Sequence, residues 1–370
     1  MLARLARRRA AHPGARGQGK VAPASCTPQR GRDTAPACWA GLPERLLHAL
    51  PGVEGHGIAC ASLREWTTMA EALPFKTSMD FAYGEPRVLA PGVRRIVANN
   101  PSPFTFKGTN TYLIGTESLA VIDPGPDDPA HLASILAAAG ARPIAYIVIT
   151  HTHRDHTAGM PALLAKTGAR TAGYGHRGAP RGSRRTSPSG SEYVERDFVP
   201  DVRLQDGDRL AGEGWALTAV HTPGHAPDHL CLALAGSRIL LSGDHVMGWN
   251  TSVVAPPEGN MRAYLRSLEL LLARDDAVYL PGHGGQVADP KRLVRAYLLH
   301  RRLREQAILD CIKSGIGSVR DIVPVIYRGL DPKLLNAASL SVLAHVEHLV
   351  ERGLVTCGSP PSFDRDLSAS

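Results

Sequence analysis

Four short apolar runs in this sequence each lead directly into a cluster of histidine and aspartate. The first is "IAYIVITHTHRDH" at 144–156, and the others are "HTPGHAPDH" at 221–229, "LLSGDH" at 240–245 and "YLPGHG" at 279–284. Imidazoles two residues apart cannot share a helix face, but at the end of a strand entering a loop they can converge on one point. The pattern predicts a fold in which several strand ends meet at one polar site.

The first cluster is the densest, with four metal-ligand types within six positions: His151, His153, Asp155 and His156. A single buried histidine is usually a satisfied polar group, but burying several unpaired polar groups together is costly unless something binds them. Imidazole and carboxylate without cysteine favour Zn²⁺ or a similar ion. One cluster has too few ligands for two closed coordination shells, so the later clusters are expected to supply the rest.

The surrounding sequence alternates strand and helix patterns. Residues 128–142 predict a helix with Asp128 as its N-cap and Pro129 at its first position, and residues 159–170 predict a second helix that ends at Gly168. Because the intervening strands are apolar throughout, they indicate sheets covered by helices. The expected fold class is α/β.

The last 80 residues have a different pattern. A long amphipathic helix is expected over 291–313, a helix begins at Ser318 with a capping-box-like Asp321, and a further helix over 331–353 precedes the short strand "LVTC". Helices followed by a terminal strand predict a small winged-helix-like module. Its basic residues are too few for a recognition stripe, so packing and RNA contact both stay open as roles. They are Arg320, Arg328, Lys333 and Arg352.

The net charge of +8 belongs to the start of the chain. Residues 1–32 hold eight Arg and Lys and no acidic residue, which leaves 34 basic against 34 acidic residues in the remainder. Global charge therefore gives no argument for a nucleic-acid partner. An Arg-rich, acid-free start is typical of either a transit peptide or a disordered extension, and Met69 and Met79 are alternative start sites.

No secretory core and no apolar run of ~20 residues is present, and the six cysteines show no metal-site or disulfide spacing. We therefore expect a cytoplasmic protein without a membrane partner, or a mitochondrial one if the source is eukaryotic and the N-terminus is a transit peptide. The expected organisation is an N-terminal extension at 1–80, a catalytic domain at 81–290, and a long helix with the winged-helix-like domain at 291–370. Nothing in the sequence indicates an oligomeric state.

Together these motifs resemble the metallo-β-lactamase-fold superfamily of hydrolases, whose members form a four-layered αββα sandwich. The resemblance implies that Asp123, in "VIDPG", buttresses the metal loop, and that His221 and His229 are structural. It implies seven metal ligands in two groups. One ion would be held by His151, His153 and His225, the second by Asp155, His156 and His283, and Asp244 would bridge them.

In such relatives two zinc ions share a water whose pKa falls toward ~7, which supplies a hydroxide nucleophile for a carbonyl or phosphorus centre. Asp155 and Asp244 are accordingly the candidate catalytic carboxylates, with metal binding as the first role of Asp155. The sequence assigns no role to Arg154.

Fold alone does not decide the substrate. True β-lactamases of this superfamily typically carry Cys or Ser at the position of Asp244, so β-lactamase activity is disfavoured. Residues 84–357 are similar to the β-lactamase-like protein 2 group, which includes endoribonucleases acting on single-stranded RNA. The favoured function is hydrolysis of a phosphodiester, best guessed as single-stranded RNA, with Lys107 and the arginines of 177–185 as candidate phosphate contacts.

Two alternatives remain. One is a glyoxalase II-type thioesterase acting on a small molecule. The other is a non-catalytic nucleic-acid-binding module with a structural metal, which is disfavoured because structural zinc sites are closed four-ligand sets.

Overall fold

The computed structural model describes residues 73–175, 198–358 and 361–370, all within the compact unit Gly55–Ser370. The predictions made for residues 1–72 and for the arginines at 177–185 lie outside this described part. Among the described residues, no helix has the length and apolar character needed to cross a membrane.

The first sheet has seven strands in the order β1-β2-β3-β4-β5-β6-β7. They are β1 (Arg87–Ala90), β2 (Val93–Val97), β3 (Asn110–Ile114), β4 (Leu119–Ile122), β5 (Ile144–Val148), β6 (Arg170–Gly173) and β7 (Val202–Arg203). Strands β1 to β4 pair antiparallel, and β4 to β7 pair parallel. Helices α2 (Pro129–Ala139) and α4 (Met160–Thr167) make two of the crossovers between the parallel strands, as parallel pairing requires.

The second sheet has five strands in the order β12-β11-β10-β9-β8. They are β8 (Arg209–Gly212), β9 (Trp215–His221), β10 (Leu230–Leu234), β11 (Ile239–Gly243) and β12 (Val278–Pro281). Only β11 and β12 are parallel, and α5 (Met261–Ala273) connects them. The long helix α6 (Pro290–Lys313) follows β12.

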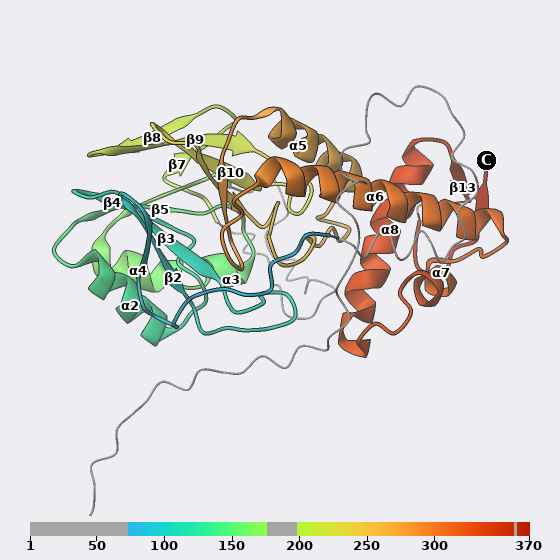
Figure 1. The fold of residues 1–370 in the computed structure, drawn as a ribbon, viewed down its shortest axis with the longest axis horizontal. Coiled ribbons are helices and arrows are strands. Elements are labelled where there is room, and N and C mark those ends of the chain that lie inside the picture. Colours follow the sequence, from blue (N-terminus) through green and yellow to red (C-terminus); the bar gives the residue numbers. More distant parts are fainter. Residues whose placement is uncertain (1–72, 176–197, 359–360) are drawn as a thin grey trace, which may run out of the picture. The chain divides into compact units, whose positions relative to one another are not determined.

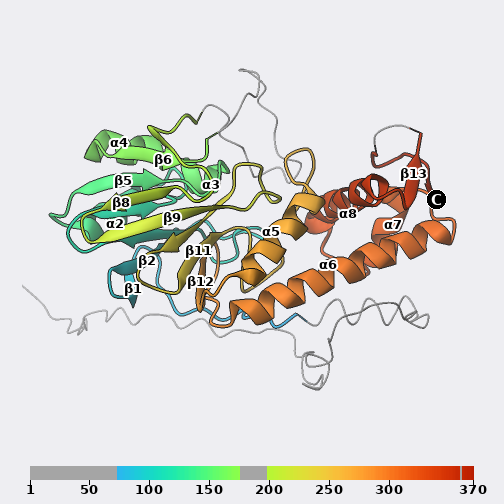
Figure 2. The same ribbon diagram turned by 90° about the horizontal axis from the view of Figure 1, so that it is seen from above.

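The two sheets pack face to face with helices outside both (Figures 1 and 2). Side chains of both sheets fill the core between them, including Ile122 and Val148 from the first sheet and Leu232 and Leu241 from the second. A separate apolar cluster joins the first sheet to α2 and α4, and another joins the second sheet to α5 and α6. The expected αββα sandwich is therefore confirmed.

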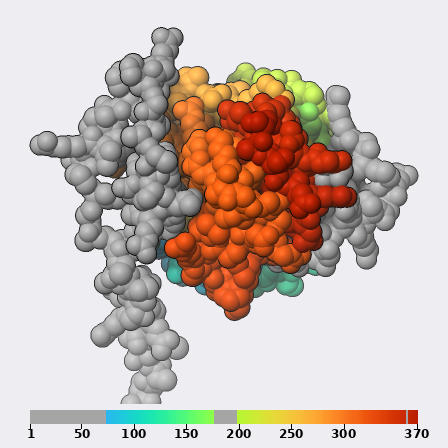
Figure 3. Space-filling model, turned by 90° about the vertical axis from the view of Figure 1, so that its right-hand side faces the viewer, coloured from blue at the N-terminus to red at the C-terminus, as the bar shows by residue number. Residues whose placement is uncertain are grey.

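The residues after α6 form a small module around a core that they share with the C-terminal part of α6. It contains α7 (Val319–Ile326), the 3-10 turn η2 (Pro332–Leu334), α8 (Leu335–Glu351) and the antiparallel pair β13 (Val355–Cys357) and β14 (Leu367–Ala369). Figure 3 shows the face on which α6 and this module lie, in orange to red. The sequence predicted the helices and β13, and the structure adds β14, which completes the two-stranded wing.

The capping residues identified in the sequence predicted these helix ends correctly. Asp128 caps α2 by accepting from the amide of Ala130, and Gly168 ends α4 in the left-handed conformation. Ser318 caps α7, where its Oγ accepts from the amide of Asp321. The loop expected after β5 contains a short helix, α3 (Arg154–Thr157), that the sequence did not predict.

Candidate metal centre

Parallel pairing brings the polar strand ends to one place. Because β4 and β5 run side by side, Asp123 lies next to Thr150, the residue before His151. In the second sheet β11 and β12 place Asp244 near the "PGH" segment, where the amide of Gly282 donates to the carbonyl of Gly243 at 2.8 Å. The two sheets join at this edge through the bridge between Thr109 and His283.

Three buried histidines form the first group of ligand atoms. Nδ1 of His153 lies 2.9 Å from Nε2 of His151 and 3.0 Å from Nε2 of His225. Nitrogens this close, all with exposed fractions of at most 5% for their residues, repel one another when each presents a lone pair. A cation between them removes that repulsion.

The second group consists of Asp155, His156 and His283. Oδ2 of Asp155 lies 3.1 Å from Nε2 of His283 and 3.3 Å from Nε2 of His156. Both Asp155 and His156 come from α3, whose single turn directs neighbouring residues to the same point.

Asp244 lies between the two groups. Its Oδ2 is 3.3 Å from Nε2 of His283 and 3.5 Å from Nε2 of His156, on one side. On the other side it is 3.8 Å from Nε2 of His225 and 4.0 Å from that of His151. Its Oδ1 is buried and has no hydrogen-bond partner among the described residues, which is unusual for a carboxylate unless another group binds it.

In three of the imidazoles the outer nitrogen has a hydrogen-bond partner, so the inner one is left as an acceptor. His156 donates from Nδ1 to Oδ2 of Asp123 at 2.9 Å, His225 donates from Nδ1 to the carbonyl of Val253 at 2.7 Å, and His283 donates from Nδ1 to that of Gly108 at 3.2 Å. Outer partners of this kind set the tautomer in which Nε2 binds a metal.

Asp123 organises the loop, as the resemblance implied. Its carboxylate accepts from the amide of Thr150 at 2.8 Å and from the Thr150 hydroxyl at 2.7 Å. With that hydroxyl proton used, Oγ1 of Thr150 accepts from Nδ1 of His151 at 3.0 Å, and Nε2 of His151 faces inward. Asp123 adopts a φ of +51°, a left-handed conformation that Asp tolerates better than most residues.

His229 supports the centre from behind. Its Nε2 accepts from the backbone amide of Asp244 at 3.1 Å, while its Nδ1 lies 2.8 Å from Oγ1 of Thr222. His221 instead stacks on Tyr174, with ring centroids 4.3 Å apart. Neither belongs to the two ligand groups, in agreement with the sequence interpretation.

The pKa shifts of the histidines differ between the two ligand groups. Burial lowers the pKa of His151 well below its usual value, and the neighbouring His156 and His153 lower it further. Burial acts in the same direction on His283, but Asp244 and Asp155 outweigh it and raise its pKa to about 10. The carboxylate side therefore selects positive charge, which a divalent cation supplies.

Close packing depends on Gly282. A Cβ on this residue would lie 2.3 Å from Oδ1 of Asp244 and 2.8 Å from Cε1 of His156, closer than any side chain permits. The donor set, the orphaned oxygen of Asp244 and this close approach all fit a metal centre. Thr152 is buried and Arg154 is exposed, and neither is among the clustered ligand atoms.

An aromatic pair that the sequence analysis missed borders the centre. The rings of Phe106 and Trp249 are stacked with centroids 4.8 Å apart, and Nζ of Lys107 lies 5.3 Å from the Phe106 centroid. Trp249 packs against Gly284, the residue after His283. Phe106 has a φ of +56°, and strain of this kind concentrates at functional sites. No local pattern links residues 106 and 249, so only the fold reveals the pair.

Comparisons with known proteins agree with this geometry. Residues 104–283 match the metallo-beta-lactamase superfamily, and residues 318–359 match the beta-lactamase-associated winged helix domain. The chain is 32% identical over 280 residues to a beta-lactamase-like protein 2 homolog of Drosophila melanogaster, covering 72% of this chain and 90% of that protein.

A lactamase-like protein, nscB, of Neosartorya fischeri is 34% identical over 230 residues, but the match spans only 62% of its length and 60% of this chain. Among solved structures, a beta-lactamase domain protein from Burkholderia ambifaria matches with a TM-score of 0.66 at 21% identity, over 81% of this chain and 98% of that one. A metallo-beta-lactamase family protein from Thermus thermophilus matches with a TM-score of 0.63 at 24% identity, over 76% of this chain and all of the other. These likenesses in structure concern the fold.

Proposed function

The chain belongs to the metallo-beta-lactamase superfamily of hydrolases, and on this premise we propose that it holds two zinc ions and hydrolyses phosphodiester bonds of single-stranded RNA. The observation that carries the proposal is the position of Asp244, whose Oδ2 lies within 4.0 Å of histidines from both ligand groups. A carboxylate placed between two groups of donors suits a pair of cations better than one.

In this proposal His151, His153 and His225 hold one ion, Asp155, His156 and His283 hold the other, and Asp244 contacts both. When bound, two such ions provide a nucleophile at neutral pH and polarise the phosphoryl oxygen. The protein contributes orientation. Asp123 fixes the imidazole of His156, and His229 fixes the backbone of Asp244. The apolar core between the sheets excludes water behind these residues.

The residues that border the centre favour a nucleic-acid strand as the substrate. Single-stranded nucleic acids bind through aromatic faces that stack on bases and cations that contact phosphates. Phe106 and Trp249 supply the stacked aromatic pair beside the His283 loop, and Lys107 supplies a cation over the Phe106 ring. The winged-helix module lends less support, because Arg320 is paired with Asp364 and Arg352 with Glu305, which favours packing over RNA contact for these two residues.

Parallel assays test the substrate. The full chain, loaded with zinc, is offered bis-p-nitrophenyl phosphate, labelled single-stranded RNA, S-lactoylglutathione and nitrocefin. We expect turnover of the two phosphodiesters. Thioester turnover without phosphodiester turnover would contradict the proposal and favour the glyoxalase II-type alternative, and binding of RNA without any turnover would favour a non-catalytic module.

A matched pair of variants identifies the centre responsible. His225→Asn and His221→Asn change two histidines of the same motif, but only His225 lies in the ligand cluster. We expect His225→Asn to lose roughly 100-fold or more in kcat/KM, since it removes a direct ligand, and His221→Asn to stay within a factor of about three. Asp244→Ala should be inactive, and unchanged turnover in that variant would indicate a contaminating enzyme.

A further inference from the structure

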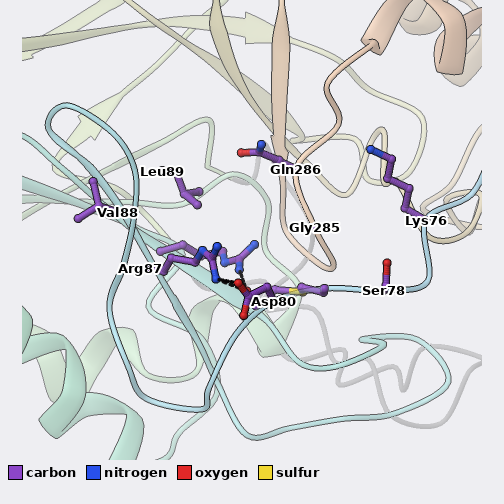
Figure 4. A pocket seen from close by; sticks show the side chains of 10 residues that line it. Lys76, Ser78, Asp80, Arg87, Val88, Leu89, Gly285 and Gln286 are labelled. Atoms are coloured by element: carbon purple, nitrogen blue, oxygen red, sulfur yellow. Dashed lines mark hydrogen bonds and ion pairs between the residues drawn. The ribbon is translucent and has the colours of Figure 1, made fainter. Parts of the chain in front are cut away.

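A second polar recess lies beside the loop that carries His283 (Figure 4). Its volume is about 460 Å³, which is in the range of small-molecule sites. The walls come from the segment before β1, from β1 and β2, and from Gly285 and Gln286, which follow His283 by two and three residues. None of the seven candidate metal ligands lines this recess, so it is a separate site.

Two arginines lie side by side in the wall of the recess. Arg87 on β1 and Arg95 on β2 are direct partners in the antiparallel ladder. Both also donate to one atom, the backbone carbonyl oxygen of Asp80, at 3.2 and 3.0 Å. Like charges directly opposite on paired strands are destabilising, so this arrangement needs an anion for compensation.

The protein supplies that compensation only in part. Among the described residues, Asp80 is the one acidic residue lining the recess, and its carboxylate pairs with Arg87 while remaining 82% exposed. Arg95 donates its hydrogen bond to the backbone carbonyl of Asp80 rather than to the Asp80 carboxylate. Arg95 is only 4% exposed, and its Nε has no hydrogen-bond partner within the described part of the chain. The protein alone therefore leaves this buried guanidinium incompletely satisfied.

We propose that this recess binds the phosphoryl group of a ligand through Arg87, Arg95 and Lys76. Three cations against one carboxylate leave two positive charges, which match a phosphate dianion better than a carboxylate. Guanidinium groups bind phosphate oxygens in a bidentate manner. Ser78 and Gln286 line the same recess and add neutral hydrogen-bond donors.

The phosphoryl group has two possible sources. It belongs either to a free phosphorylated small molecule or to the strand that the metal centre cleaves, with one of its phosphates seated next to the His283 loop. Only the second source rests on the proposed function. The site itself stands on the paired arginines and on the excess of positive charge in the lining of the recess.

Titration with inorganic phosphate tests the site. Isothermal titration calorimetry is carried out on the full zinc-loaded chain, on Lys76→Gln/Arg87→Gln, and on Lys166→Gln/Arg209→Gln. The two double variants remove the same charge from exposed positions, but only the first pair lines the recess. We expect the recess variant to bind phosphate at least about tenfold more weakly and the control to bind as the unaltered chain does. Equal affinities in the two variants would overturn the proposal.

Thermal unfolding gives an independent readout. A ligand that binds the folded state raises the melting temperature by an amount that grows with the ratio of its concentration to its Kd. Phosphate should therefore raise the Tm of the control variant more than that of the recess variant. Because phosphate bound at the metal ions stabilises both variants alike, an equal shift would assign the binding to the metal centre and reject the recess.

Kinetics on labelled single-stranded RNA separate the two sources. A raised KM with unchanged kcat in Lys76→Gln/Arg87→Gln, against the matched control, would place a strand phosphate in the recess. An unchanged KM combined with weakened phosphate binding would assign the recess to a free phosphorylated molecule. If the chain cleaves no RNA, the proposed function fails while the phosphate titration still decides the existence of the site.

Discussion

At the scale of single residues, the geometry of the candidate centre depends on side chains outside the two ligand groups. Asp123 is the main example, because one carboxylate holds His156 directly and His151 through Thr150. Losing such an outer partner typically costs about 10–100-fold in metal affinity.

Asp123→Asn tests this role. The amide keeps the shape and the tolerance for positive φ, but it is a poorer acceptor for the imidazole of His156. We expect zinc affinity, measured by competition with a chromogenic chelator, to fall by about 10–100-fold. Asp127→Asn, an exposed change in the same loop, is the control and should bind zinc normally. Equal affinities for the two variants would show that Asp123 does not tune the centre.

At the scale of elements, Gly224 positions the "TPGH" loop against α5. Its φ is +139°, and a Cβ there would lie 2.3–2.5 Å from the backbone and Cβ of Tyr264. Gly224→Ala should therefore push the loop off the helix, displace His225, lower zinc affinity and destabilise the fold by roughly 2 kcal/mol or more.

Gly236→Ala is the matched control for that change. Gly236 also has a positive φ, of +72°, but a Cβ there meets nothing within 4 Å. We expect it to cost about 1 kcal/mol in urea unfolding and to leave zinc binding intact. A Gly224→Ala chain that binds zinc as tightly as Gly236→Ala would contradict the role assigned to this contact.

Glu305 joins helices α6 and α8 and makes their contact sensitive to acid. It lies 2.6 Å from Nδ1 of His348 and also pairs with Arg352. Burial would raise the pKa of Glu305, but the neighbouring His345 and the hydrogen bond from His348 outweigh burial and lower it to about 2. A depressed carboxyl pKa contributes stability that is present above the ordinary value near 4.5 and is lost as the pH falls toward 2.

Glu305→Gln should therefore destabilise the chain by about 1–2 kcal/mol at pH 7, after allowance for partial solvent screening. The difference from the unaltered chain should shrink as the pH falls below 4.5. Urea unfolding at several pH values measures it, and the exposed Glu269→Gln is the control. A difference that stays constant down to pH 3 would show that the ionised carboxylate is not the source.

The elements also show what a sequence can and cannot predict. Asp128, Gly168 and Ser318 act through neighbours within a few residues, so the helix ends they mark are visible in the sequence. The bond from Glu305 to His348 and the ladder pair of Arg87 with Arg95 join residues without a shared local pattern. Contacts of this second kind become visible only when the strands and helices are assembled.

At the scale of the whole molecule, the same distinction explains the candidate site. The cluster at 151–156 is visible in the sequence because its ligand types are adjacent, and the αββα fold and family membership expected from it are confirmed. For His225, Asp244 and His283, the assignment as ligands came from the family resemblance and not from their spacing in the sequence. The structure brings them within reach because β9, β11 and β12 all end at one edge of the sandwich.

The stoichiometry of bound metal tests whether the centre holds two ions. The full chain is loaded with zinc, freed of excess by gel filtration, and measured by inductively coupled plasma mass spectrometry against protein concentration from amino-acid analysis. We expect two zinc ions per chain, and two also for His221→Asn, because His221 lies outside the ligand groups. One ion or fewer per chain would contradict the two-metal centre.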